Sequence, residues 1–113
     1  TVGPPYSAPM LLWPPDGTVY RGEDATVLVQ WMAVGYLKTD EWYVVRVRRE
    51  GNVIGEQWTK ANAWRLPAEL RPPTDAADHR LTWEVLIMRQ EGLDTGKGTV
   101  LVPVAATRWL EWY

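Results

Sequence analysis

The stretch RLTWEVLIM, residues 80 to 88, alternates large apolar side chains with mixed ones at a period of two. One face of this stretch carries Leu81, Trp83, Val85 and Ile87. Alternation of this kind is typical of a β-strand that turns one face toward a core. We see no helical periodicity of any length elsewhere in the sequence. The stretch therefore predicts an all-β chain.

Three other stretches carry apolar residues at alternate or denser positions, and Gly, Pro or Asp bounds each of them. They are residues 26–32, 42–48 and 107–113. Strand alternation places one set of side chains in the core, namely Val27, Val29 and Trp31 from the first stretch and Tyr43, Val45 and Val47 from the second. The last stretch is expected to be the closing strand.

Shorter apolar runs and turn signals complete the pattern. We expect short strands at residues 10–13, 19–20, 53–59, 64–66 and 99–104. The sequence Glu50-Gly51-Asn52 predicts a hairpin turn, and the glycines at 92, 96 and 98 predict a flexible hairpin or loop. Turn signals every 8 to 12 residues favour an antiparallel Greek-key β-sandwich of about seven strands.

Length and charge limit the classes of partner. The chain has 113 residues, which suits one domain, and we divide it into a Pro-rich extended linker or edge segment (1–9) and a sandwich domain (10–113). Twelve basic and fourteen acidic residues give a net charge of −2 with no basic block, which argues against nucleic acid. No apolar run approaches the ~20 residues that cross a bilayer, so we expect no membrane insertion. The chain begins at Thr1 without a signal peptide, so we expect a processed protein or a segment of a longer one.

Few side chains suit catalysis or metal binding. The chain has no Cys, one His and one Ser, and the Pro-rich opening offers nothing to hold Ser7 beside His79. Asp75, Asp78 and His79 lie close enough in sequence to bind a metal, but an exposed loop explains them equally well. The segment Glu91–Thr99 lacks the first Gly and the following helix of a phosphate-binding loop. We therefore predict no enzyme activity, no metal and no cofactor.

Several stretches resemble a fibronectin type III or immunoglobulin-like domain of bacterial extracellular proteins. Val27-Leu28-Val29-Gln30-Trp31 is similar to the family's second strand with its core Trp, and Tyr43-Val44-Val45-Arg46-Val47 is similar to the third. Leu70-Arg71-Pro72, followed by Trp83-Glu84-Val85, is similar to the crossover into the sixth strand, although Trp83 replaces the usual corner Tyr. The resemblance implies a non-catalytic structural or adhesive module at the cell surface or outside the cell. Its partners would be neighbouring domains or other subunits, including a homo-oligomer or filament.

The eight Trp residues are the feature that most suggests binding. Trp31 and Trp83 belong to core faces. Three interpretations, ordinary packing, protein contact or stacking on sugar rings, are open for Trp42, Trp58, Trp64, Trp109 and Trp112. A planar row of exposed indoles would favour a carbohydrate-binding module, and a self-complementary apolar patch would favour assembly. The candidate binding surface comprises Trp42, Val44, Arg46, Arg48, Trp58, Trp64, Trp109 and Trp112.

Overall fold

The computed structural model describes residues 6–92 and 97–113. Residues 1–5 of the predicted linker and residues 93–96 of the predicted Gly-containing loop lie outside the described residues. The described chain is built from β-strands, with one short 3-10 helix, η1. The elements are β1 Leu11–Trp13, β2 Thr18–Tyr20, β3 Leu28–Trp31, β4 Glu41–Arg49, β5 Asn52–Thr59, β6 Ala63–Arg65, η1 Ala68–Leu70, β7 Arg80–Gln90, β8 Gly98–Val102 and β9 Arg108–Trp112.

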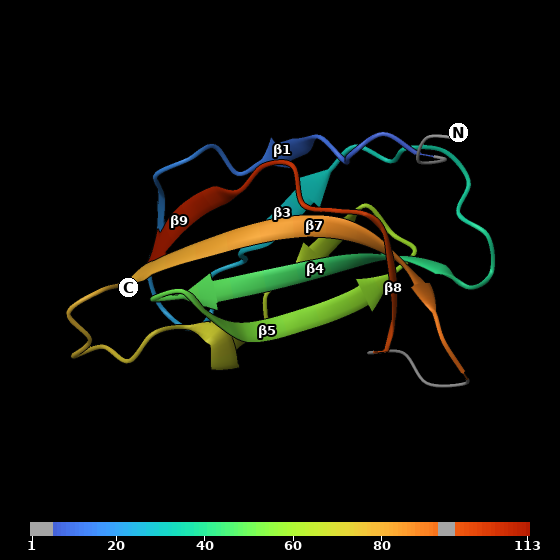
Figure 1. The fold of residues 1–113 in the computed structure, drawn as a ribbon. Helices are drawn as coiled ribbons and strands as arrows, with labels where there is room; N and C mark the ends of the chain where they lie inside the picture. The colour runs from blue at the N-terminus through green and yellow to red at the C-terminus, as the bar shows by residue number, and fades with distance from the viewer. Residues whose placement is uncertain (1–5, 93–96) are drawn as a thin grey trace.

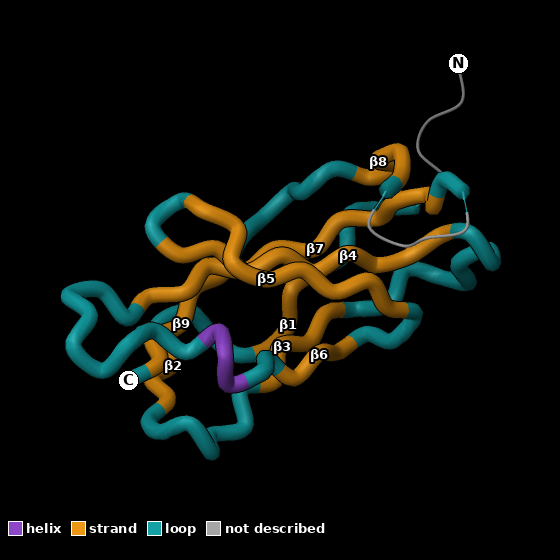
Figure 2. The backbone as a smooth tube through the Cα atoms, turned by 90° about the horizontal axis from the view of Figure 1, so that it is seen from below, coloured by secondary structure: helices purple, strands orange, loops and turns teal. Residues whose placement is uncertain are grey.

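The strands form two sheets. The smaller sheet has the order β1-β3-β6, and the larger has the order β2-β9-β7-β4-β5, with β8 alongside the end of β7. Figure 1 shows β5, β4 and β7 side by side, and Figure 2 shows β1, β3 and β6 grouped together. The all-β prediction is confirmed.

The expectation of purely antiparallel pairing is wrong at one place, because β2 runs parallel to β9. After β1 the chain turns at Pro15, Asp16 and Gly17 and enters the larger sheet beside the last strand. The Trp109 amide donates to Asp16 Oδ1 at 3.0 Å, and the Gly17 amide donates to the Trp109 carbonyl at 3.1 Å. This turn moves the first part of the chain from one sheet to the other.

Each of the nine described strands overlaps one of the nine stretches expected from the sequence, so only the total of about seven strands for the sandwich is exceeded. The turn at residues 14–17 divides the opening into β1 and β2, which lie in different sheets. The last part of the chain is likewise divided, because residues 103–107 separate β8 from β9 although both strands pair with β7. Pro103 explains the interruption, since proline has no N–H to donate to a neighbouring strand.

The β4–β5 hairpin forms where the sequence predicted it. Glu50 and Gly51 both have positive φ, at 53° and 81°, as a two-residue turn matched to the twist of the flanking strands requires. The register then continues along β5 with one irregularity near its start. β5 lies at the edge of the larger sheet.

One core cluster contains side chains from both sheets. Its residues include Leu11, Val29 and Trp31 from the smaller sheet and Tyr43, Trp83 and Trp112 from the larger. The inward residues predicted for residues 26–32, 42–48 and 80–88 are all buried, which confirms the strand phase. Burying a large apolar side chain stabilises the fold by about 1.5–3 kcal/mol, so this cluster is the main source of stability.

Candidate functional site

The predicted binding residues of β4 all point to the outer face of the larger sheet. Trp42, Val44, Arg46 and Arg48 alternate with the buried residues of that strand. The strand register places Trp58 opposite Val44, and Trp109 opposite Thr82, which is itself opposite Arg48. Directly opposed residues share a face of a sheet. The structure therefore brings most of the predicted surface together on one face.

This outer face is partly covered by the chain itself. Val44, Leu86 and Met88 form a second buried cluster, against which Trp58 and Val104 pack. The start of β8 lies against Trp58, since a Cβ on Gly98 would be 3.2 Å from Trp58 Cη2. Val44 is fully buried, so its place on an exposed surface is corrected. Val44 is buried because Val104, which lies between β8 and β9 along the chain, packs against the outward side chains of this cluster.

The arginines of this face are engaged in ion pairs. Arg46 Nε lies 2.7 Å from Glu56 Oε1, and Arg48 Nε lies 3.0 Å from Glu84 Oε1. Glu84 is buried, so the second pair neutralises a carboxylate that would otherwise be costly. Exposed ion pairs contribute only about 0–1 kcal/mol, so the first pair chiefly orients its side chains.

Trp112 and Trp64 lie elsewhere, which corrects their assignment to the predicted surface. Trp112 is fully buried in the main core, and its indole Nε1 donates to the Gly22 carbonyl at 2.7 Å. Trp64 lies opposite the buried Val29 and packs on the same core. In the run Trp109 to Tyr113, the sequence alone did not determine which aromatic residues point inward.

A different apolar surface, which was not among the predicted binding residues, lies on the outer face of the smaller sheet. Its members are Met10, 60% exposed, Leu12, 44%, Trp13, 50%, and Met32, 49%. Leu11 and Trp31 point inward and are opposite one another, so the neighbouring Met10, Leu12 and Met32 point outward. The alternation around those two core residues was the available signal. We call Met10, Leu12, Trp13 and Met32 the apolar patch.

A surface pocket of about 370 Å³ adjoins the apolar patch. No charged residue lines it, and its walls come from the opening segment and from the chain that follows β3. The lining residues are Ser7, Ala8, Met10, Met32, Ala33 and Val34.

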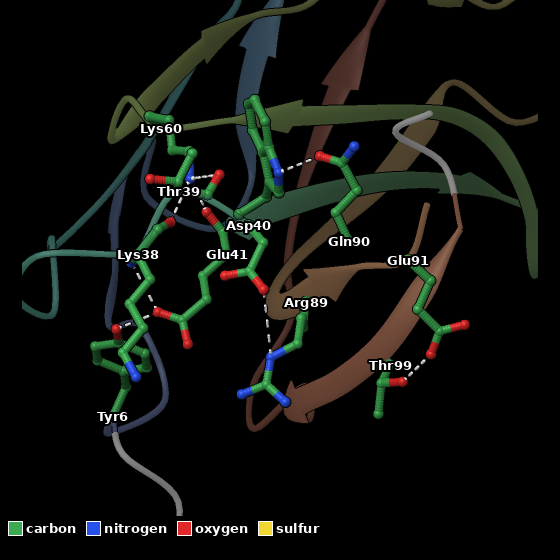
Figure 3. A network of polar contacts seen from close by, with 11 residues as sticks. Tyr6, Lys38, Thr39, Asp40, Glu41, Lys60, Arg89, Gln90, Glu91 and Thr99 are labelled. Atoms are coloured by element: carbon green, nitrogen blue, oxygen red, sulfur yellow. Dashed lines mark hydrogen bonds and ion pairs between the residues drawn. The ribbon is translucent and has the colours of Figure 1, made fainter. Parts of the chain in front are cut away.

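A polar cluster ties the opening segment to the start of β4 (Figure 3). Glu41 is 1% exposed, and its Oε1 accepts hydrogen bonds from the Tyr6 hydroxyl and, at 2.8 Å, from the Lys38 amide. Burial alone raises the pKa of Glu41, but these hydrogen bonds and the charges of Lys38 and Arg89 outweigh it and hold the pKa below 4.5. The bond to Glu41 raises the pKa of Tyr6 above 10.0, and burial adds to this effect.

Lys60 joins the same cluster from the segment between β5 and β6. Its ammonium donates to the carbonyl oxygens of Lys38 at 2.7 Å, of Thr39 at 3.0 Å, and of Glu41. It also lies 4.4 Å from the centre of the Trp42 ring, a favourable cation–π distance. Trp42 in turn donates to Gln90 Oε1 at 2.9 Å. Trp42 is therefore part of a structural network at this end of the sheet.

The residues considered for catalysis or metal binding lie in different surroundings. Ser7 lines the surface pocket, whereas His79 is buried, with Nδ1 3.1 Å from the Trp112 carbonyl and its ring stacked on Tyr113. Asp78 Oδ1 accepts a hydrogen bond from the Arg80 amide at 2.9 Å. Within residues 6–92 and 97–113, no three His, Asp or Glu side chains gather as metal ligands would. The described residues also contain no helix long and apolar enough to span a membrane.

The sequence matches no family model, and no curated protein or solved structure matches it either. The resemblance to fibronectin type III and immunoglobulin-like domains therefore stays a prediction.

Proposed function

We propose that this chain is a fibronectin-III-like or immunoglobulin-like β-sandwich that serves as a non-catalytic structural or adhesive module. Two features support the sandwich. The strand sets β1-β3-β6 and β9-β7-β4 have the order of the two facing sheets in such domains, and both sheets contribute side chains to one core. The extracellular, bacterial setting comes from the sequence resemblance, and neighbouring domains or other subunits are the proposed partners.

The apolar patch carries the proposal that the module works by protein contact. Exposed apolar side chains are normal when scattered, but a contiguous group on a small domain marks an interaction surface. Met10, Leu12, Trp13 and Met32 are all more than two-fifths exposed and lie on neighbouring segments of one sheet. A second copy of the chain would suit an uncharged patch of this kind, because a self-contact brings no like charges together.

Light scattering after size-exclusion chromatography tests this proposal. Over a wide concentration range, we expect the apparent mass to rise above the 12.9 kDa of one chain. The double variant Leu12→Gln, Met32→Gln should stay at the single-chain mass. Val53→Gln is the matched control, because Val53 is 45% exposed but lies in the larger sheet. It should associate like the wild type.

A mass that stays at 12.9 kDa at every concentration would contradict self-association through the patch. Association that persists in the double variant would contradict the patch as its site. In either case, a pull-down with neighbouring segments of the parent protein would be the next test of contact with other domains.

Carbohydrate binding is the alternative function, and it requires a row of exposed indoles. The structure describes all eight Trp side chains. Trp13 alone among them has more than a third of its surface exposed to solvent. Trp42, Trp58 and Trp109 share the outer face of the larger sheet but are half-buried. The geometry thus favours protein contact over stacking on a sugar chain.

A further inference from the structure

The opening segment Tyr6–Pro9 lies against the domain as a strap. Pro9 is buried, and Tyr6 and Ala8 pack on the main core. Beyond it, the Met10 carbonyl accepts a hydrogen bond from the Met32 amide at 2.8 Å, which joins the chain to the end of β3. The strap has no strand pairing of its own among the described residues, so its attachment depends on side chains.

The Tyr6 hydroxyl is the polar end of that attachment. It donates to Glu41 Oε1 and lies 3.1 Å from the Tyr36 carbonyl. The same carboxylate oxygen accepts a hydrogen bond from the Lys38 amide. Glu41 therefore connects two segments, the strap and the chain after β3, and these two segments form the walls of the surface pocket.

We propose that Tyr6 and Glu41 form an acid-sensitive latch, which releases the strap and widens the surface pocket of about 370 Å³ when the Glu41 carboxylate is protonated. An ionised carboxylate accepts strong hydrogen bonds from Tyr6 and from the Lys38 amide. A protonated carboxyl group accepts them weakly and carries a proton of its own, so the Tyr6 bond loses most of its strength. This inference does not depend on the partner of the apolar patch.

The charges around Glu41 determine the direction of the response. Lys38, from the preceding loop, and Arg89, from β7, favour the ionised form. Asp40 is the neighbouring acid, and its Oδ2 lies 3.8 Å from Arg89 Nε. The Lys60 ammonium donates to the backbone carbonyl of Glu41 and not to its carboxylate. The Tyr43 hydroxyl accepts a hydrogen bond from the Val34 amide at 2.9 Å and donates none to the carboxylate. Since the pKa of Glu41 is held below 4.5, the latch is closed at neutral pH and opens only below that value.

The three methionines offer a test with a built-in control. Met10 and Met32 line the pocket, whereas Met88 belongs to the separate cluster on the outer face of the larger sheet. With ¹³C-methyl-labelled Met, NMR spectra recorded while the pH is lowered should show Met10 and Met32 shifting together, with a midpoint below 4.5. The Met88 signal should stay in place until the whole domain unfolds.

Variants identify the group that titrates. Glu41→Gln cannot ionise, so the shared shift of Met10 and Met32 should disappear. Tyr6→Phe removes the donor, so both signals should already hold their acid positions at neutral pH. Glu84→Gln is the matched control, because Glu84 is a second buried carboxylate that is paired with Arg48 and lies outside the latch. It should keep the wild-type midpoint.

Three results would overturn the latch. The first is a single transition in which Met88 shifts together with Met10 and Met32. The second is an unchanged midpoint in Glu41→Gln, and the third is a wild-type neutral spectrum in Tyr6→Phe. The Met88 signal also reports whether each variant is folded, and the two latch variants remove different partners of the same bond. Failure of one of them to fold therefore leaves the other decisive.

Discussion

Trp31 and Tyr43 show how single residues join the two sheets. Their rings meet edge to face, with centroids 5.7 Å apart and an interplanar angle of 66°. Trp31 comes from β3 of the smaller sheet and Tyr43 from β4 of the larger, so the contact spans the core. The Tyr43 hydroxyl also accepts a hydrogen bond from the Val34 amide at 2.9 Å. Aromatic pairs of this geometry add about 0.5–1.5 kcal/mol beyond the area they bury.

Trp31→Ala should lower the free energy of unfolding by about 3–5 kcal/mol, because it empties a buried aromatic site. Urea denaturation followed by circular dichroism measures this loss. Trp31→Phe is the control, since it keeps a ring and removes an indole N–H that has no partner in the described structure. It should cost clearly less than the Ala variant. If the Ala variant were as stable as the wild type, the core position of Trp31 would be wrong.

The strand β8, which pairs with the end of β7, covers part of the outer face of the larger sheet. Gly98 pairs with Gln90 and lies against the Trp58 ring. A Cβ at residue 98 would be 2.1 Å from the Arg89 carbonyl oxygen, which is closer than any real contact. The obstacle is backbone, so a change of side-chain rotamer cannot relieve it. Close backbone approach is a recognised reason for glycine within a strand.

Gly98→Ala should therefore shift β8 away from β7 and destabilise the fold by about 1–3 kcal/mol, the usual range for overpacking. Hydrogen exchange should show faster amide exchange in β8 and at the end of β7, and the total tryptophan emission should shift to longer wavelength as Trp58 becomes more exposed to water. Lys97→Ala changes the exposed neighbouring residue and should leave exchange unchanged. Equal protection in Gly98→Ala and wild type would contradict the close approach.

The polar cluster around Glu41 makes the stability of the whole fold depend on pH at both the acid and the alkaline extreme. The pKa of Glu41 is lower in the folded chain than its ordinary value of 4.5. Its contribution is therefore complete above pH 4.5 and is lost as the pH falls through the folded pKa. The pKa of Tyr6 is raised above 10.0, so its contribution is present below pH 10.0 and is lost as the pH rises through the folded pKa.

We expect the free energy of unfolding of the wild type to exceed that of Glu41→Gln at neutral pH, with a difference that shrinks below pH 4.5. Other carboxylates also titrate in acid, so the difference between the two proteins, and not the wild-type curve alone, isolates Glu41. Urea denaturation at a series of pH values measures it. A difference that stays constant from pH 7 into the acid range would show that the charge of Glu41 does not stabilise the fold.

The strands can be predicted from local sequence, because the alternation around Val29, Tyr43 and Trp83 is a local property that core burial requires. The same holds for the hairpin turn at Glu50-Gly51, where Gly51 suits a positive φ, whereas the two-residue connection imposes the positive φ of Glu50. Even most of the outer-face group, such as Trp42 and Arg46, followed from the same alternation. The inward or outward direction of strand side chains and the residues of a turn depend on neighbours along the chain. They can therefore be predicted from the sequence without knowledge of the fold.

Which of the outward residues are exposed to water depends on contacts between distant parts of the chain. Val44 is buried because the chain around β8 returns over it, whereas Met10 and Met32 stay exposed because nothing described covers the smaller sheet there. The meeting of Tyr6 with Glu41, and the parallel pairing of β2 with β9, likewise join residues far apart in sequence. Alternation assigns a side chain to a face, but solvent exposure depends on which distant segment lies over that face, and no local pattern encodes it.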